Sequence, residues 1–232
     1  MITRVSLLIA LVLVIVSCSS NDPVSPQPTV EQPKAGSTFT YERYSTDPTT
    51  GAPIESSKIV FVTTIEQTGL TFLGKTNVSK VKTDIQGVVN ESYMCYEPNG
   101  DLSISALYND VPAGWVTWPT ATRTTIVSVV VDTTYSSGGL TISNKVSGTT
   151  SFVGNETMTV KGKAESVSKM LQVLENSVTM AGIPQTLTIS QEGYYAPSIR
   201  FFAKTYAEGV TNPLTGQRTE GMMSILVDYD LK

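Results

Sequence analysis

The sequence lacks most of the side chains with which enzymes do their chemistry. Its 232 residues include no histidine, and its two cysteines, Cys18 and Cys95, lie far apart. Without histidine, neither a Ser-His-Asp triad nor a Cys-His pair can form. Histidine-bearing zinc sites are excluded too, and two cysteines cannot make a cysteine cage. Acid–base chemistry on two carboxylates needs no histidine, so a glycan hydrolase of that kind stays open.

A carboxylate pair would have to come from acidic residues that lie in no recognisable local motif. No Asp-x-Asp-x-Asp-Gly loop is present for calcium. Acids on strands usually belong to solvated faces, so we expect a non-catalytic protein without cofactor or metal. The candidates for a catalytic pair are Glu91, Glu97, Asp101, Glu156 and Glu192.

Two short motifs match the patterns of known catalytic sites. Residues 69–76, GLTFLGKT, fit the phosphate-loop pattern, but that loop must open a helix, and the residues after Thr76 alternate like a strand. Ser166 and Lys169 fit the S-x-x-K of penicillin-binding enzymes, but the accompanying Ser-Asp-Asn and Lys-Thr-Gly elements are missing. We interpret both as chance matches and expect no nucleotide partner.

The first residues resemble the leader of a bacterial lipoprotein. Arg4 precedes an apolar run over residues 5–16, which is shorter than the roughly 20 residues of a membrane-spanning helix. Ile15-Val16-Ser17-Cys18 resembles the lipobox. The resemblance implies that residues 1–17 are removed and that Cys18 carries a diacylglycerol and an acylated amine. An ordinary signal peptide with an incidental cysteine is the alternative.

The residues after Cys18 indicate where the protein resides. Ser19, the residue after the lipidated cysteine, resembles the sorting signal for the outer membrane. Asp at this position would instead retain a lipoprotein in the inner membrane. Residues 18–36 are rich in proline and poor in large apolar residues, so they predict an extended, mobile tether. We expect a lipid-anchored protein of the cell envelope, at the outer membrane, facing either the periplasm or the surface.

The charge balance argues against several partners. The chain carries 16 Lys and Arg against 20 Asp and Glu, with no basic cluster. This balance argues against nucleic acid as a partner and against electrostatic binding to anionic lipid. Once Cys18 is acylated, Cys95 has no partner for an intramolecular disulfide. It lies in a strand-like run, which favours a buried small hydrophobe over a reactive thiol or an intermolecular bridge.

Alternation of apolar and polar residues dominates the remainder of the chain and predicts strands. Ile59, Phe61 and Ile65 share one face with Thr63, and Thr125, Val127, Val129 and Val131 share another. Residues 164–175 fit both a helix and a strand, and we favour a strand because the flanking residues 160–163 are typical of a hairpin turn. Residues 111–119 are interpreted as a non-repetitive bridge. The prediction is one mainly β domain over residues 37–232, with about ten to twelve antiparallel strands, little helix, and either a curved sheet or half-barrel or a sandwich.

Aromatic residues beside prolines are the remaining candidates for a binding site. They could form a stacking platform or the mouth of an apolar pocket, or they could plug the end of the sheet's core. These residues are Trp115, Trp118, Tyr194 and Tyr195.

Residues 152–207 resemble a pattern in uncharacterised periplasmic proteins of Gram-negative bacteria. The matching residues are Gly154, Glu156, Val160, Gly162 and the run Tyr194-Tyr195-Ala196-Pro197, in which Tyr194 stands for the usual Trp and Ser198 replaces the usual Gly. Such proteins look distantly like the Lol-type lipoprotein carriers, in which a curved sheet wraps an apolar cavity. The resemblance implies a ligand such as a lipid or acyl chain, or an envelope protein as partner. A structural or adhesion module on the cell surface is the alternative.

Overall fold

The structure is a computed structural model, and it describes residues 31–108, 111–137, 140–180, 183–211, 216 and 218–232. The expected signal peptide, Cys18 and most of the expected tether lie outside these residues, as do the turn residues Gly138 and Gly139. Residues 31–36 of the expected tether run against the domain. Gln32 donates to the Asn77 carbonyl at 3.0 Å and accepts from the Ser79 hydroxyl at 2.9 Å.

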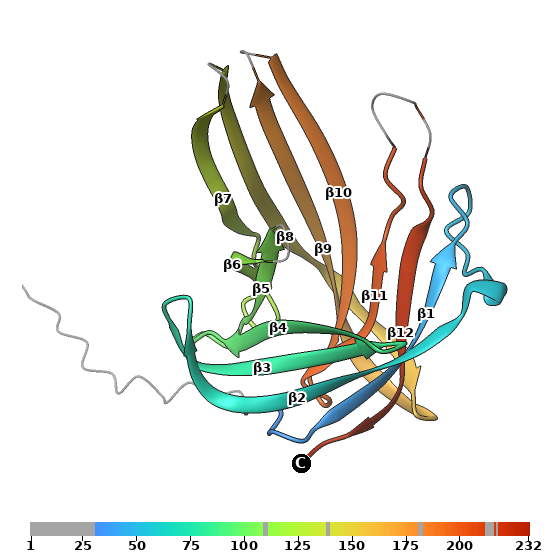
Figure 1. Ribbon diagram of the computed structural model, residues 1–232. Coiled ribbons are helices and arrows are strands. Elements are labelled where there is room, and N and C mark those ends of the chain that lie inside the picture. Colours follow the sequence, from blue (N-terminus) through green and yellow to red (C-terminus); the bar gives the residue numbers. More distant parts are fainter. Residues whose placement is uncertain (1–30, 109–110, 138–139, 181–182, 212–215, 217) are drawn as a thin grey trace, which may run out of the picture.

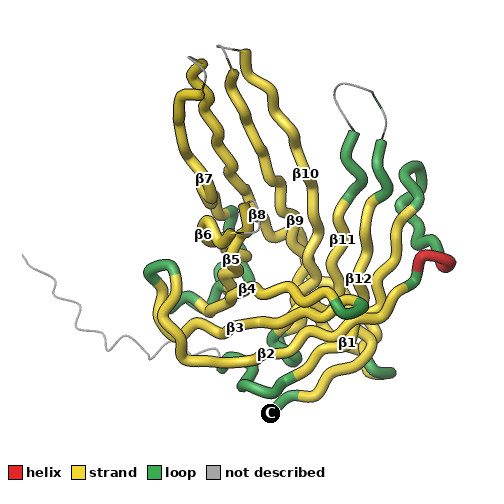
Figure 2. Tube along the Cα trace, in the orientation of Figure 1, coloured by secondary structure: helices red, strands yellow, loops and turns green. Residues whose placement is uncertain are grey.

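Almost all of the described chain is β-structure, as predicted. The one helical element among these residues is the short 3-10 turn η1 (Glu55–Ser57), seen in red in Figure 2. Among the described residues, no helix is long and apolar enough to span a membrane. The strands are β1 (Thr38–Thr46), β2 (Ile59–Phe72), β3 (Lys75–Ile85), β4 (Val88–Tyr96), β5 (Leu102–Tyr108), β6 (Val111–Trp118), β7 (Ile126–Ser137), β8 (Leu140–Val160), β9 (Lys163–Met180), β10 (Ile183–Ala196), β11 (Phe201–Ala207) and β12 (Gly221–Asp230).

All twelve strands belong to one antiparallel sheet. Its order is β6-β5-β4-β3-β2-β1-β12-β11-β10-β9-β8-β7, so strands that follow one another along the chain are paired, except β6 and β7, and β1 also pairs with β12. The sheet curls strongly, and the long strands β7 to β10 stand above the crossing strands β2 to β4 (Figure 1). This confirms the curved sheet and excludes the sandwich that the sequence had left open.

The two edge strands of the sheet, β6 and β7, come together and nearly close it into a barrel. The Thr117 amide donates to the Ser128 hydroxyl at 3.3 Å across this seam. Gly114 allows the close approach, because a Cβ there would lie 3.1 Å from the Val130 carbonyl oxygen. The seam brings the edges of the sheet within contact of each other without a regular ladder among the described pairings.

Most expected elements are confirmed. Residues 164–175 lie within β9, and the preceding turn holds Lys161 and Gly162 at φ values of 51° and 74°. The expected bridge over 111–119 is wrong, because Val111–Trp118 is the strand β6. Its Pro112 is accommodated because β6 is an edge strand and its pairing with β5 shifts register next to this proline.

The alternation predicted over residues 125–131 is broken by a bulge. The register of β7 against β8 shifts between Val129 and Val131. As a result Val127 and Val129 are exposed, while Val130 and Val131 are both buried. An extra residue in one strand turns every later side chain to the opposite face, which simple alternation cannot anticipate.

The core lies on the concave face of the sheet. Trp118 and Tyr195 both pack edge-on against Phe202, with ring centroids 5.0 and 6.1 Å away. Gly193 makes room for this cluster, because a Cβ there would lie 2.7 Å from both the Trp118 and the Phe202 rings. Cys95 is buried as expected, and burial raises the pKa of its thiol to about 11.

Candidate functional site: a pocket on the concave face

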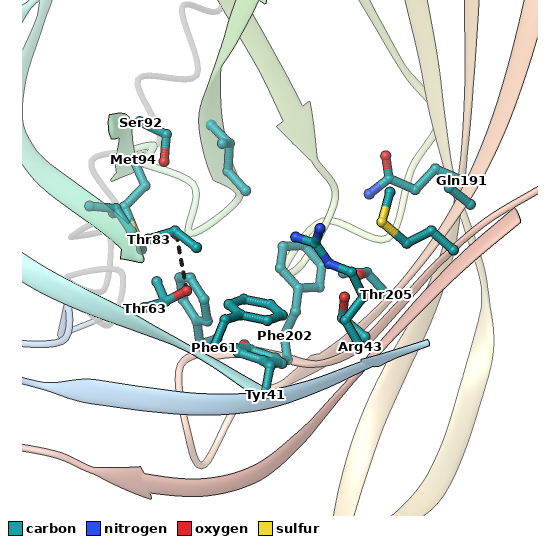
Figure 3. Close-up of a pocket in the computed structure, with 16 residues that line it drawn as sticks. Tyr41, Arg43, Phe61, Thr63, Thr83, Ser92, Met94, Gln191, Phe202 and Thr205 are labelled. Carbon is teal, nitrogen blue, oxygen red and sulfur yellow. Dashed lines mark hydrogen bonds between the residues drawn. The ribbon is translucent and has the colours of Figure 1, made fainter. Parts of the chain in front are cut away.

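A pocket of about 430 Å³ opens on the concave face of the sheet. Eight strands contribute side chains to it, from β1 to β5 and from β10 to β12. Figure 3 shows these side chains converging from both halves of the sheet. The pocket therefore exists only because the sheet curls, since its lining residues are separated by up to 183 positions in the sequence.

One side of the pocket is apolar and largely aromatic. The rings of Tyr41 and Phe61 stack with centroids 5.2 Å apart, and Phe202 lies beside them (Figure 3). Met94 from β4 and Ile104 from β5 are directly opposite each other in the ladder and continue the apolar wall. These side chains offer a surface suited to an apolar ligand.

The floor of the pocket is fixed by a hydrogen bond that spans the sheet. The Tyr41 hydroxyl donates to the Phe202 carbonyl at 2.6 Å, from β1 to β11 past the intervening β12. Tyr41 is buried, and burial raises the pKa of its hydroxyl well above the usual value. The hydroxyl therefore stays neutral and acts as a fixed structural donor.

Polar side chains lie around the apolar wall. In the ladders, Arg43 on β1 is opposite Ser224 on β12, and Ser224 is opposite Thr205 on β11, so these three form one row across the sheet. On the other side, the hydroxyls of Thr63 and Thr83 are 3.1 Å apart (Figure 3). Hydroxyl groups and one cation are thus available to orient a ligand that has a polar end.

Of the described residues that line this pocket, only Arg43 carries a charge. Its guanidinium carbon lies 5.0 Å from the centre of the Phe61 ring, which is a cation–π contact. Burial lowers the pKa of the guanidinium, although the group stays charged at any physiological pH. The alternation of Phe39, Tyr41 and Arg43 along β1 is the sequence signal that could have identified Arg43 as a residue of the pocket, because it places this arginine on the same inward face as the two aromatic residues.

The four aromatic residues expected at a site do not come together. Trp118 and Tyr195 belong to the core around Phe202, so for them the plug interpretation holds. Trp115 lies apart from the core, edge-on to Phe72 at 6.2 Å, and donates to the Leu73 carbonyl at 3.1 Å. It therefore holds the tip of the β2–β3 hairpin to β6.

Tyr194 forms a separate cluster with charged residues. Lys169 and Lys204, its ladder partners on β9 and β11, place their ammonium groups 5.3 and 4.9 Å from the centre of its ring. Its hydroxyl donates to Glu192 at 2.7 Å, and Lys169 pairs with Glu192 at 2.9 Å. Burial alone would raise the pKa of Glu192, but the hydrogen bonds from Tyr194 and Lys169 lower it below its usual value.

The remaining candidate acids are engaged in local contacts. Glu91 pairs with Lys80 at 2.7 Å, Glu97 contacts Lys75 and the Ser103 hydroxyl, and Glu156 is exposed on β8. Asp101 is fully buried and caps the connection that follows β6. Its oxygens accept from the Ala121 and Thr122 amides at 2.9 Å each, from the Thr122 hydroxyl at 2.8 Å and from the Asn99 side chain at 3.0 Å.

Neither chance motif lies in the surroundings that its chemistry requires. Residues 69–76 span the end of β2, the turn at Leu73 and Gly74 with φ values of 42° and 76°, and the start of β3, so a strand follows instead of a helix. Ser166 and Lys169 lie within strand β9. Among the described residues, no group of three or more Cys, Asp and Glu is placed to hold a metal ion.

Comparisons with known proteins give the chain structural relatives only. No family model matches it, and no curated protein does. It is similar to the crystal structure of a candidate lipoprotein from Parabacteroides distasonis ATCC 8503, with 10% identity and a TM-score of 0.44 over 87% of this chain and 98% of that one. It is also similar to a candidate exported protein with a YmcC-like fold from Bacteroides fragilis NCTC 9343, with 14% identity and a TM-score of 0.42 over 86% and 97%.

Proposed function

We propose that this chain is a lipid-anchored, non-catalytic protein of the cell envelope that holds an apolar ligand in the concave pocket. The leader and Cys18 provide the anchor at the outer membrane, and the segment after Cys18 spaces the domain from the bilayer. The curled sheet carries the binding function, and no cofactor takes part.

The pocket is the observation that carries this proposal. Its volume of about 430 Å³ falls in the range of small-molecule sites, which are about 300–1,000 Å³ and mostly apolar. Tyr41, Phe61 and Phe202 give it an aromatic side, and the Tyr41–Phe202 hydrogen bond keeps that side in place. A pocket that is formed before its ligand arrives loses little conformational entropy on binding.

The acids support a binding role over hydrolysis. A glycan hydrolase needs two carboxylates that face each other across the bond to be cut. Each of Glu91, Glu97, Asp101 and Glu192 instead accepts hydrogen bonds or pairs with a lysine in its own locality, and Glu156 is exposed on β8. None of these five acids is among the residues that line the concave pocket.

The test uses the full chain carrying Cys18→Ser, which removes the proposed acylation site and allows purification without detergent. The neutral fluorophore N-phenyl-1-naphthylamine serves as the probe, because its emission rises in apolar surroundings. We expect saturable binding that Thr83→Phe weakens about tenfold or more, since the new ring would occupy the pocket. Thr64→Phe is the matched control on the opposite face of the sheet, beside Val62 and Lys82, and should leave binding unchanged.

Two results would contradict the proposal. One is the absence of saturable probe binding by the Cys18→Ser chain. The other is equal binding by the Thr83→Phe and Thr64→Phe variants, which would place the probe elsewhere, for example on the apolar leader that both variants carry. Ser92→Phe, which fills the same pocket from β4, replaces Thr83→Phe if that variant does not fold.

A further inference from the structure

Arg43 is held in the pocket with part of its hydrogen-bonding capacity unused. Its Nε atom is buried and has no hydrogen-bond partner among the described residues. No ion pair of Arg43 occurs among them either, whereas Lys169 pairs with Glu192 and Lys75 with Glu97. A buried donor without an acceptor costs roughly 1–3 kcal/mol, and more for a charged group.

The surroundings of Arg43 are arranged to receive a second polar group. Ser224 and Thr205 continue its row across β12 and β11, and Gln191 lies near by in the next row. Figure 3 shows the guanidinium projecting into the pocket beside the aromatic rings, with Gln191 on the other side of Arg43. A planar guanidinium with several donors matches a carboxylate or a phosphate, which accepts two parallel hydrogen bonds.

Among the described residues that line the concave pocket, none is a carboxylate. Glu220 lines the adjoining hollow together with Arg43, but it forms no ion pair with Arg43 and does not line the concave pocket itself. Tyr41 is the other titratable residue of the pocket, and its hydroxyl is committed to the Phe202 carbonyl. An anion inside the pocket therefore has to come with the ligand.

We propose that the pocket selects an amphiphile with one apolar chain and an anionic head, and that the head pairs with the Arg43 guanidinium. The chain lies along Tyr41, Phe61 and Met94, and the hydroxyls of Ser224 and Thr205 accept or donate hydrogen bonds at the head. The inference rests on the proposed function of the pocket, and it adds the chemical class of the ligand. A fatty-acid carboxylate and a phosphate monoester share the required chemistry.

The test measures displacement of N-phenyl-1-naphthylamine from the full Cys18→Ser chain by three ligands of equal chain length: dodecanoate, monododecyl phosphate and dodecanol. We expect the two anions to displace the probe at concentrations about tenfold or more below that of dodecanol, as a charged hydrogen-bonded pair implies. The stronger of the two anions identifies the head group.

Arg43→Met should abolish this preference and leave probe and dodecanol binding within about twofold, because it keeps the length of the side chain and removes its charge. Arg123→Met is the matched control, since Arg123 also lies over a phenylalanine ring, at 5.2 Å from that of Phe152, but outside the pocket. If Arg43→Met does not fold, the concentrations at which the three ligands displace the probe from the unmodified pocket still test whether it prefers an anionic head.

The outcomes separate the inference from the function on which it rests. Equal displacement by dodecanol and the two anions, or a preference that survives Arg43→Met, overturns the anionic head and leaves the apolar pocket standing. A chain that binds neither the probe nor any of the three ligands overturns both.

Discussion

Asp101→Asn tests whether this buried carboxylate holds the edge of the sheet. Asp101 lies in the turn between β4 and β5 and accepts four hydrogen bonds, three of them from residues 121 and 122 beyond the edge strand β6. In the amide variant the remaining oxygen can keep the two amide donors. The new NH₂ group faces the Asn99 side-chain donor, and the Thr122 hydroxyl must turn to accept from it.

The expected cost follows from the bonds that are lost. Hydrogen bonds to a charged group contribute about 1.5–3 kcal/mol each, and the variant loses one outright and weakens the others. We therefore expect the free energy of unfolding to fall by about 2–3 kcal/mol. Urea unfolding followed by tryptophan fluorescence measures this, because buried Trp118 lies at the end of β6. Glu156→Gln, at an exposed acid on β8, is the control and should stay within about 0.5 kcal/mol.

A different result would refute this reasoning. A carboxylate whose role is catalytic, and not structural, can often be replaced without loss of stability, or even with a gain. If Asp101→Asn is as stable as the unchanged chain within about 0.5 kcal/mol, Asp101 does not act as the cap, and its burial needs another explanation.

Four further perturbations test separate parts of the account. Tyr41→Phe should lower the free energy of urea unfolding by about 1–2 kcal/mol, because it removes the hydroxyl that donates to the Phe202 carbonyl at 2.6 Å. Tyr229→Phe is the control and should change this free energy little, because the Tyr229 hydroxyl has no hydrogen bond among the described residues. Gly193→Ala should cost about 1–3 kcal/mol in the same assay through its clash with Trp118 and Phe202, whereas Gly154→Ala, whose new methyl group meets open space, should cost nothing. Glu192→Gln should lower the free energy of unfolding by roughly 1 kcal/mol at pH 7. Because the folded-state pKa of Glu192 is lowered, its stabilising effect is present above the unfolded-state pKa and is lost as the pH falls through the folded-state pKa. The unfolding free energies of the unchanged chain and the variant should therefore become equal in acid. Cys18→Ser should abolish the incorporation of labelled fatty acid into the protein in cells, and a variant that is still labelled would contradict acylation at Cys18.

The local pattern of the sequence was enough to predict the fold class, because a strand buried on one face imposes a period of two. Ile59, Phe61, Thr63 and Ile65 behave in this way and face the core side of β2. The period fails where the backbone departs from regular pairing. The bulge at Val130 and the Pro112 of β6 are such places, and each led to an incorrect boundary or face.

The candidate site could not be predicted because it depends on the closure of the whole sheet. Met94 and Gln191 reach one pocket only after β1 and β12 have paired and the sheet has curled. The aromatic residues attracted attention by their proximity to prolines, which says nothing of the strand neighbours that bury Trp118 and Tyr195. Arg43 was missed because an arginine in an alternating strand is ordinarily assigned to the solvent face.

Native mass spectrometry of the full Cys18→Ser chain, purified without detergent and then mixed with dodecanoate, tests the concave binding site most directly. The account predicts a complex with one ligand per chain for the unchanged pocket and for Thr64→Phe, and its loss in Thr83→Phe. A spectrum that shows only the unliganded mass, or the same occupancy in both phenylalanine variants, would contradict the proposal that the pocket binds an apolar chain.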